Sequence, residues 1–302
     1  MKLVTYAYEQ LVAVGLLASN TVIDVAASAA RVGALVDLSS MLALIRSGDE
    51  ALTVIREIAN QPQLFPTTTY PLKQVTLLSP IPKPARNIFC VGRNYLDHVK
   101  EGFDAQQAEV KLPEVPQFFT KATHAINTPT GEIRVDEKTT RWLDYEVELA
   151  VVIGKSGRDI AKEKAFDHVF GYTIANDITA RDLQKRHEQW FKGKSLDTTL
   201  PLGPCIVVRD AVPDVKALEL SCHVNGERRQ QAAASQMMFD IPTIIASLSA
   251  GMTLDAGDII CTGTPAGVGF AMKIPQKLKD ADVVVSTISG IGELRNKVVI
   301  KS

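Results

Sequence analysis

Two glutamates that alternate with apolar residues constrain this chain more than any other feature. They lie in residues 143–154, a stretch rich in β-branched residues that ends in glycine and therefore predicts a β-strand. Successive strand side chains point to opposite faces, so Glu146 and Glu148 share one face, with Cα atoms roughly 7 Å apart. The other face carries Tyr145, Val147 and Leu149. After residue 149 both faces are apolar, which predicts that the strand enters the core.

Two carboxylates side by side on a strand repel each other unless something screens them. Two explanations stay open from this stretch alone: a face bathed in water, which is the ordinary reason for a Glu-x-Glu pair, or a bound cation. Asp177 ends a second predicted strand, over residues 172–177, and can supply a third oxygen ligand. An aspartate at that place is otherwise an ordinary capping residue.

Charge and cysteine content exclude several classes of function. The 302 residues include 33 Lys+Arg and 34 Asp+Glu, and no basic block indicates nucleic acid or an anionic membrane as a partner. The four cysteines are scattered, which predicts buried thiols in a reducing compartment: Cys90, Cys205, Cys222 and Cys261. No apolar run reaches the length that spans a membrane. We therefore expect a cytoplasmic protein.

The chain divides by pattern into a small N-terminal α/β module, residues 1–75, and a larger domain, residues 76–302. The module begins with a hairpin, continues with two helices over residues 41–58, and ends in a linker rich in proline and threonine. The proline-rich segment 81–84 cannot be helix or central strand and marks the boundary. Strands with interspersed helices, and no regular βαβ alternation, predict the α+β class.

Three further features of interest lie outside the predicted strands. His98 and Glu101 are three residues apart, so a helix would place them on one face, where Glu101 can orient His98 as a general base. A solvated pair is the alternative. Residues 103–117 form an irregular segment that suits a mobile lid. Lys194 follows glycine as in a phosphate-binding loop, but Glu188 stands where that loop needs a glycine, so an exposed lysine is the default reading.

Four blocks in this order resemble the fumarylacetoacetate hydrolase family, over residues 80 to 302. They are Gly92-Arg93-Asn94-Tyr95 with His98 and Glu101, then Asp144 to Leu149, Gly171 to Gln184, and Thr262 to Gly269. The segments after Asp182 and after Gly193 are most similar to the YisK-like bacterial members, which are associated with oxaloacetate decarboxylation. The N-terminal module has only a weak resemblance.

The resemblance implies a mixed β-sheet roll or barrel, a homodimer, and a set of site residues. It implies that Glu146, Glu148 and Asp177 hold one Mg²⁺ or Mn²⁺ ion. It further implies catalytic roles for His98, Glu101 and Lys194, and substrate contacts from Arg93, Arg181, Gln184 and Thr264. The irregular segment 103–117 varies in such enzymes, so it leaves the identity of the 2-oxo acid open.

The chemistry of such a site agrees with the family's reactions. Three carboxylates suit a hard divalent cation, and a 2-oxo acid can chelate that cation through its carboxylate and keto oxygens. Cleavage of the C3–C4 bond leaves a pyruvate enolate, whose charge the cation and Lys194 would stabilise. Hydrolysis of an acylpyruvate needs His98 to activate water, whereas oxaloacetate loses carbon dioxide without water. A tautomerase can use the same site.

We therefore expect an enzyme that cleaves a carbon–carbon bond in 2-oxo or 2,4-dioxo acids. Decarboxylation of oxaloacetate comes first, narrowly ahead of the hydrolysis of acylpyruvates such as fumarylpyruvate. An isomerase or hydratase of 2-oxo-ene diacids in aromatic catabolism is the next alternative. A catalytically idle metabolite-binding or scaffold protein is the last, and an intact His98, Glu101 and Lys194 argue against it, because a binder needs no base.

Overall fold

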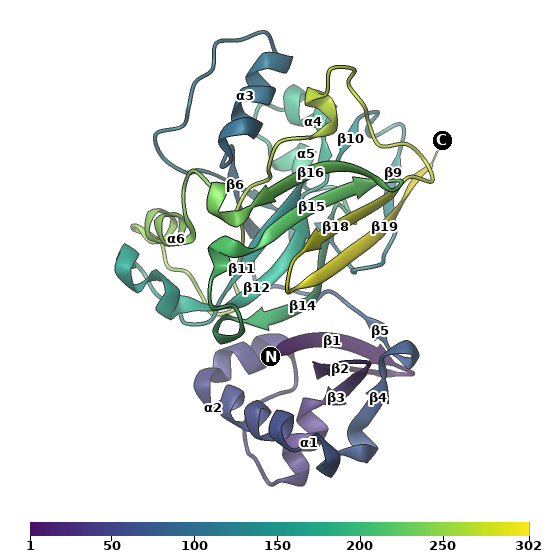
Figure 1. Cartoon of the computed structure of the whole chain (residues 1–302), viewed down its shortest axis with the longest axis vertical. Coiled ribbons are helices and arrows are strands. Elements are labelled where there is room, and N and C mark those ends of the chain that lie inside the picture. Colours follow the sequence, from purple (N-terminus) through teal and green to yellow (C-terminus); the bar gives the residue numbers. More distant parts are fainter. Residues whose placement is uncertain (302) are drawn as a thin grey trace.

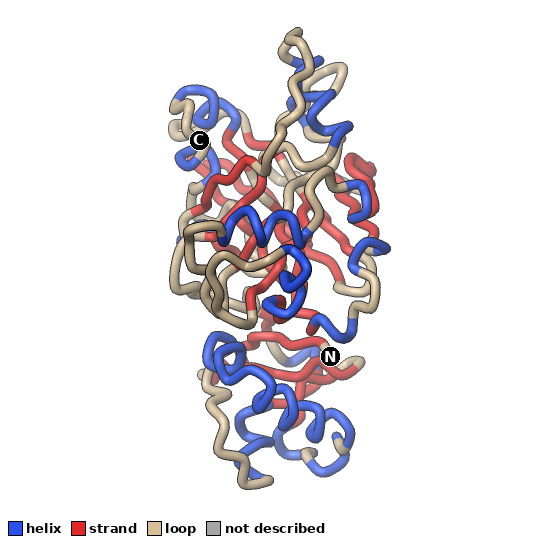
Figure 2. The backbone as a smooth tube through the Cα atoms, turned by 90° about the vertical axis from the view of Figure 1, so that its left-hand side faces the viewer, coloured by secondary structure: helices blue, strands red, loops and turns tan. Residues whose placement is uncertain are grey.

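The computed structural model describes residues 1–301, and its strands form three open sheets (Figures 1 and 2). The largest, of twelve strands, follows the order β4 (Thr69–Pro71), β3 (Thr21–Asp24), β2 (Leu11–Ala18), β1 (Lys2–Tyr8), β14 (Leu200–Val208), β12 (Val169–Asn176), β11 (Val147–Ile153), β17 (Ile259–Cys261), β6 (Ile88–Gly92) and β7 (Gln117–Lys121). Its remaining strands are β5 (Thr76–Leu77), paired with β1, and β8 (Ile126–Asn127), paired with β14.

The second sheet has five strands in the order β16 (Glu227–Ala233), β15 (Glu219–Val224), β18 (Val283–Ile288), β19 (Gly292–Lys301) and β9 (Ile133–Asp136). The third consists of β10 (Leu143–Asp144) and β13 (Thr179–Ala180). The predicted α+β class is confirmed, and the sheets of the described residues do not close into a barrel.

Within residues 1–301, six α-helices accompany the sheets: α1 (Val25–Arg31), α2 (Met41–Asn60), α3 (Leu96–Ala105), α4 (Arg181–Arg186), α5 (Phe191–Lys194) and α6 (Ile241–Ser249). The two predicted N-terminal helices are the halves of α2, which kinks at Gly48, where φ is +56°. The Ser40 hydroxyl caps the first half by accepting a hydrogen bond from the backbone N–H of Ala43. Residues Lys162–His168 form a 3₁₀ segment. No helix among residues 1–301 is both long and apolar enough to cross a membrane.

The N-terminal part of the chain is joined to the main sheet by hydrogen bonds. Strand β1 pairs antiparallel with β2 on one side and with β14 on the other, where Lys2 faces Val207 and Leu3 faces Ile206. Figure 1 shows this part, in purple and blue, as a separate lobe below the larger one. The predicted linker contains β4 and two 3₁₀ turns. The division into residues 1–75 and 76–302 remains a proposal.

The predicted strand over residues 143–154 is two strands, β10 and β11, because each half has a different partner. Leu143 in β10 faces Ala180 in β13, whereas Val147 in β11 faces Asn176 in β12. Glu146 therefore lies in the break immediately before β11, where its backbone N–H donates to the Asn176 side chain at 3.1 Å. The prediction of one continuous strand was wrong at this point.

The alternation of faces along β11 agrees with the sequence pattern. The side chains of Val147, Leu149 and Val151 belong to the core between the two large sheets, whereas Ala150 and Val152 belong to the core beneath the N-terminal helices. Glu148 shares the face of Ala150 and Val152 but lies nearer the start of the strand. That face therefore changes from acidic to apolar within two residues.

Candidate active site

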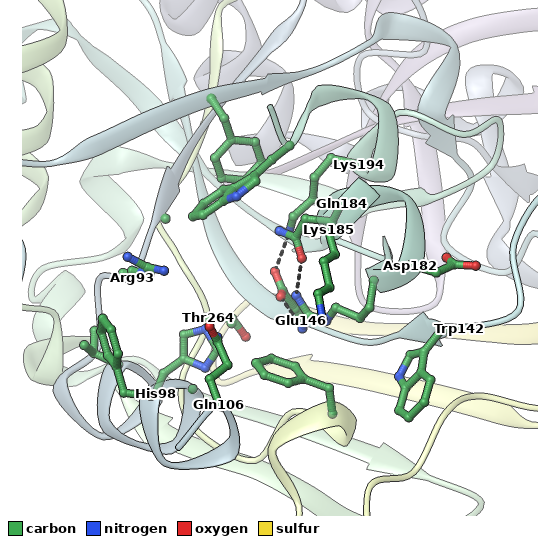
Figure 3. A pocket seen from close by; sticks show the side chains of 18 of the residues that line it. Arg93, His98, Gln106, Trp142, Glu146, Asp182, Gln184, Lys185, Lys194 and Thr264 are labelled. Atoms are coloured by element: carbon green, nitrogen blue, oxygen red, sulfur yellow. Dashed lines mark hydrogen bonds and ion pairs between the residues drawn. The ribbon is translucent and has the colours of Figure 1, made fainter. Parts of the chain in front are cut away.

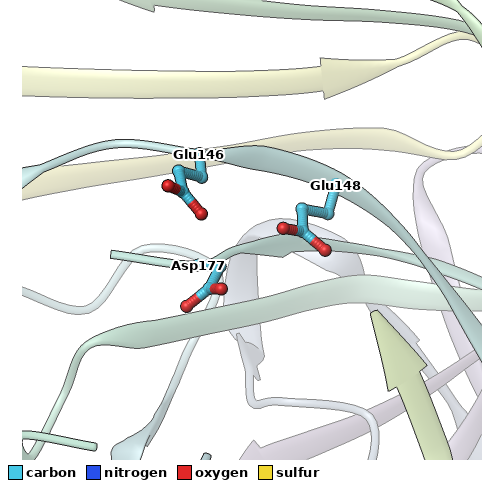
Figure 4. A group of neighbouring side chains, drawn as sticks. All are labelled: Glu146, Glu148 and Asp177. Carbon is cyan, nitrogen blue, oxygen red and sulfur yellow. The ribbon is translucent and has the colours of Figure 1, made fainter. Parts of the chain in front are cut away.

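Three acidic side chains meet where β11 begins and β12 ends (Figure 4). One carboxylate oxygen from each of Glu146, Glu148 and Asp177 lies within 4.8 Å of the other two. The antiparallel pairing of Val147 with Asn176 is the cause, because it places Asp177 opposite the break that contains Glu146. All three side chains are buried, with residue exposures of 4%, 1% and 0%. The solvated-face explanation of the two glutamates is therefore wrong.

Cations neutralise two of these carboxylates. The Nζ atom of Lys194 lies 2.6 Å from Oε2 of Glu146 and 2.7 Å from Oδ2 of Asp177. Arg181 contacts Oε1 of Glu146 at 2.6 Å and Oδ2 of Asp144 at 3.0 Å. Burial by itself favours neutral Lys194, but Asp177 and Glu146 outweigh it, and the pKa of the ammonium is raised. The exposed lysine that was the default from the sequence is wrong, since Lys194 is 2% exposed.

Glu148 differs from its two neighbours because no cation pairs with it among the described residues. Its Oε2 accepts a hydrogen bond from the backbone N–H of Gly263 at 2.7 Å. Burial and the nearby charge of Asp177 raise the pKa of Glu148 well above its ordinary value. Burial also acts to raise the pKa of Glu146, but Lys194 and Arg181 lower it to about 2.

The site therefore contains a buried carboxylate whose charge lacks compensation, next to two further carboxylates. Removing an anion from water is costly unless a positive charge accompanies it. A divalent cation meets that need at Glu148, and an all-oxygen set of carboxylates is what Mg²⁺ and Mn²⁺ prefer. The residues present thus fit such an ion.

A second buried lysine belongs to the site, and the sequence analysis missed it. Lys121, the last residue of β7, is fully buried, and its Nζ donates to Oδ1 of Asp177 at 2.7 Å and to the carbonyl of Ile178 at 3.0 Å. Both oxygens of Asp177 are thereby fixed by lysines. No local signal distinguishes Lys121 from an exposed lysine at a strand end, because its partners lie 56 and 57 residues away.

We expect the Lys121→Met substitution to destabilise the protein. It leaves an oxygen of buried Asp177 without its partner, and breaking a buried ion pair on one side costs about 3–5 kcal/mol in unfolding free energy. Guanidinium-induced unfolding of the metal-free protein measures this. Lys192→Met, at an exposed neighbour of the site, is the control and should leave the midpoint unchanged. Equal midpoints for both variants would show that Lys121 does not hold Asp177 in place.

His98 and Glu101 form the predicted pair on helix α3. The Nδ1 atom of His98 lies 2.8 Å from Oε1 of Glu101, and Oε2 of Glu101 accepts from the backbone N–H of Gly267 at 2.8 Å. Their side chains are only 12% and 19% exposed, which argues against a merely solvated pair. Because Nδ1 is engaged with Glu101, Nε2 of His98 is the nitrogen left for substrate. Glu101 thereby fixes both the ring and the glycine loop.

The predicted residues surround one cavity of about 620 Å³, a volume typical of small-molecule sites (Figure 3). Eight of them line it: Arg93, His98, Glu146, Glu148, Arg181, Gln184, Lys194 and Thr264. The other two, Glu101 and Asp177, contact residues of the lining. From the expected lid, the lining includes Phe103 and Gln106, which lie at the end of α3 and just beyond it. Whether the rest of residues 103–117 moves remains a prediction.

Gln184 and Thr264 are held by neighbours that the sequence analysis did not consider together. The Oε1 atom of Gln184 accepts from Arg181 at 3.2 Å. The Thr264 hydroxyl donates to the carbonyl of Val147 at 2.9 Å and accepts from the Gln230 side chain at 2.8 Å. Gln230 comes from β16 and also accepts from the N–H of Val147, so it ties the second sheet to the start of β11. Thr264 can therefore offer substrate an acceptor oxygen, since its proton is already donated.

Comparisons with known proteins agree with this arrangement. Residues 87–299 match the model of the fumarylacetoacetate hydrolase C-terminal domain. The chain is 48% identical over 263 residues to the oxaloacetate tautomerase YisK of Bacillus subtilis, and the aligned residues cover 86% of each chain. A fumarylacetoacetate hydrolase from Exiguobacterium antarcticum is 41% identical and superposes with a TM-score of 0.82, covering both chains fully. Maleylpyruvate hydrolase from Sphingobium sp. SYK-6, solved with manganese(II) and pyruvate, is 30% identical with a TM-score of 0.78, again covering both chains fully.

Proposed function

Because the chain belongs to the fumarylacetoacetate hydrolase family, we propose that it is a divalent-metal-dependent enzyme that forms the enolate of 2-oxo diacids such as oxaloacetate. The observation that supports this most directly is the buried triad of Glu146, Glu148 and Asp177 beside a cavity of about 620 Å³. Burying an acidic group is costly unless a positive charge accompanies it, and Glu148 has no cationic partner within residues 1–301. Perturbed pKa values in a cavity are also typical of functional sites.

Each side chain has a part that follows from its contacts. A Mg²⁺ or Mn²⁺ ion held by the triad would supply positive charge for the oxygens of the 2-oxo acid. Arg181 and Gln184, which contact each other, are placed to orient the acid's carboxylate. Lys194 remains charged, so it can stabilise the negative charge that develops on the keto oxygen. His98, through Nε2, can take a proton from carbon 3 or return it.

Three reactions of a 2-oxo acid develop negative charge on the keto oxygen at carbon 2, and they differ in which bond to carbon 3 breaks. Tautomerisation of oxaloacetate moves a proton between carbon 3 and oxygen, and it needs a base but no water. Decarboxylation breaks the C3–C4 bond and releases carbon dioxide. Hydrolysis of an acylpyruvate breaks the same bond after His98 has activated a water molecule for attack on C4.

We place tautomerisation of oxaloacetate first, ahead of the decarboxylation that sequence analysis put first. The name of the Bacillus subtilis relative, at 48% identity, favours it. Hydrolysis of acylpyruvates is the second candidate, because the maleylpyruvate hydrolase has the same fold and is described with manganese(II) and pyruvate. We keep decarboxylation as a side reaction of the keto form of oxaloacetate in the same site, in which the C3–C4 bond breaks, carbon dioxide leaves and the enolate of pyruvate remains.

We expect every activity of the enzyme to require the metal. One assay can test this and can also distinguish the three reactions. NMR in D₂O with Mg²⁺ or Mn²⁺, on oxaloacetate and fumarylpyruvate, follows exchange at carbon 3 together with loss of C4. Oxaloacetate should show enzyme-dependent exchange faster than decarboxylation. Excess chelator should stop every reaction, and added Mg²⁺ or Mn²⁺ should restore it. Unchanged rates in excess chelator would contradict metal dependence.

Two further features are proposed with the function. The family resemblance suggests a homodimer, which light scattering after size-exclusion chromatography tests. All four cysteines are buried and free, in agreement with the sequence analysis, and free thiols favour a reducing compartment. We propose a cytoplasmic location on that ground, and cell fractionation tests it.

A further inference from the structure

Arg93 is a half-buried cation of the cavity that forms no ion pair within residues 1–301. Its guanidinium carbon lies 5.2 Å from the centre of the Phe103 ring and 5.8 Å from that of the Trp190 ring. Within residues 1–301 it makes no ion pair and no side-chain hydrogen bond. Two other cations of the site, Lys194 and Arg181, each already pair with two carboxylates of the protein. Arg93 is thus held in place by aromatic rings while all its N–H donors stay free.

The backbone around Arg93 fixes where this guanidinium lies. Arg93 has φ of +56°, a left-handed conformation that a non-glycine residue seldom adopts and that clusters at functional sites. The preceding Gly92 lets Trp190 approach closely, because a Cβ there would come within 2.4 Å of the indole ring. The next residue, Asn94, is anchored by hydrogen bonds to the carbonyls of Phe239 and Thr262 at 3.0 and 2.8 Å. The turn therefore positions Arg93 at the cavity wall.

Figure 3 places Arg93 apart from the metal end of the cavity. Glu146, Gln184 and Lys194 lie together in that view, whereas Arg93 lies on the far side, with His98 on the same side. A substrate whose 2-oxo acid group occupies the metal end can therefore place its other end on the side where His98 and Arg93 lie. An unpaired guanidinium packed against aromatic rings is suited to bind a carboxylate, because its N–H groups can donate two parallel hydrogen bonds to the two carboxylate oxygens.

We propose that Arg93 binds the second carboxylate of the substrate and so selects dicarboxylic over monocarboxylic 2-oxo acids. This inference rests on the proposed function, because it assigns the opposite end of the same substrate. Lys185 also lines the cavity without an ion pair, but it is an exposed lysine whose ammonium is hydrated and mobile. Arg93 is half-buried and fixed by two rings, so it should contribute more to discrimination.

The test compares two substrates that differ only at that end. Oxaloacetate carries a carboxylate where 2-oxobutanoate carries a methyl group, and enzyme-dependent exchange at carbon 3 is measured for both with Mg²⁺. We expect Arg93→Met to lower kcat/KM for oxaloacetate roughly 10- to 100-fold, because a charged hydrogen-bond partner is lost. The same variant should change kcat/KM for 2-oxobutanoate less than about threefold. The kcat/KM of Arg93→Lys for oxaloacetate should lie between those of wild type and Arg93→Met, because lysine keeps the charge but cannot donate two parallel hydrogen bonds.

Three controls make the outcome decisive. Lys185→Met should leave the ratio of the two substrates unchanged, and a selective loss in that variant rather than in Arg93→Met would assign the role to Lys185 instead. Equal losses on both substrates would show that Arg93 only supports the packing of Trp190 and Phe103, which overturns the inference. If Arg93→Met does not fold, as judged by its melting temperature, the ratio in Arg93→Lys decides. A wild-type protein inactive toward both substrates would instead refute the proposed function.

Discussion

Replacing Glu148 by glutamine should abolish turnover and, at the same time, make the metal-free protein no less stable. Glutamine has the same shape and keeps an oxygen for the N–H of Gly263, which Glu148 accepts at 2.7 Å. The substitution removes the carboxylate of a residue that is 1% exposed and that has no cationic partner within residues 1–301. Metal affinity and activity should both be lost, by about 10³-fold or more in rate. Without metal, loss of the uncompensated buried charge should stabilise the fold or leave it unchanged.

Thermal unfolding with and without Mn²⁺, together with turnover of oxaloacetate, measures both effects. Wild-type protein should melt at a higher temperature when Mn²⁺ is added, because ligand binding to the native state stabilises it. The Glu148→Gln variant should show no such rise. Glu137→Gln, which makes the same substitution at an exposed position, serves as control and should behave as wild type. A variant that turns over normally, or that still gains stability from Mn²⁺, would refute the proposed metal site.

The candidate metal ligands could be predicted because each belongs to a pattern within a few neighbouring residues. Alternation places Glu146 and Glu148 on one face of the strand region, and Asp177 follows the next strand along the chain. Strands that are consecutive in the sequence pair more often than distant ones, so the glutamates and Asp177 are expected to lie close together. The helical spacing of His98 and Glu101 worked for the same reason: helix geometry is local.

Features that depend on distant pairing could not be predicted in the same way. Lys121 meets Asp177 although three strands, β11, β17 and β6, lie between their own strands β12 and β7 in the order of the sheet. The break at Glu146 exists because Leu143 and Val147 face different partner strands, β13 and β12. Alternation along the chain carries no information about either partner, and both errors have that origin.

The N-terminal region shows the same division between local and distant information. Its hairpin and the two halves of helix α2 follow from turn residues and from the cap at Ser40, all of which are local. Helix α1 was not predicted, although Asp24 caps it by accepting from the N–H of Ala27 at 2.8 Å. The pairing of β1 with β14 joins residues about 200 apart, as Lys2 and Val207 show, and no pattern within either strand indicates it.

Replacing His98 by alanine should leave metal binding intact and lower the rate of enolisation by about 10²–10⁴-fold, which is the usual contribution of a general base. His98 contacts Glu101 at 2.8 Å but pairs with none of the triad carboxylates, so the rise in melting temperature with Mn²⁺ should persist. That combination separates this variant from Glu148→Gln, which should lose both properties. Exchange at carbon 3 of oxaloacetate and hydrolysis of fumarylpyruvate give the two rates.

The Glu101→Gln variant tests whether Glu101 fixes the orientation and the protonated ring nitrogen of His98. Glutamine can keep the contact with the Gly267 N–H, but its amide can then donate to Nδ1 of His98, which moves the ring proton to Nε2 and removes the base from the cavity. We therefore expect a loss approaching that of His98→Ala, although the ring itself remains in place. If both variants enolise oxaloacetate at the wild-type rate yet fail to hydrolyse fumarylpyruvate, His98 acts on water alone. Proton transfer at carbon 3 would then need another group.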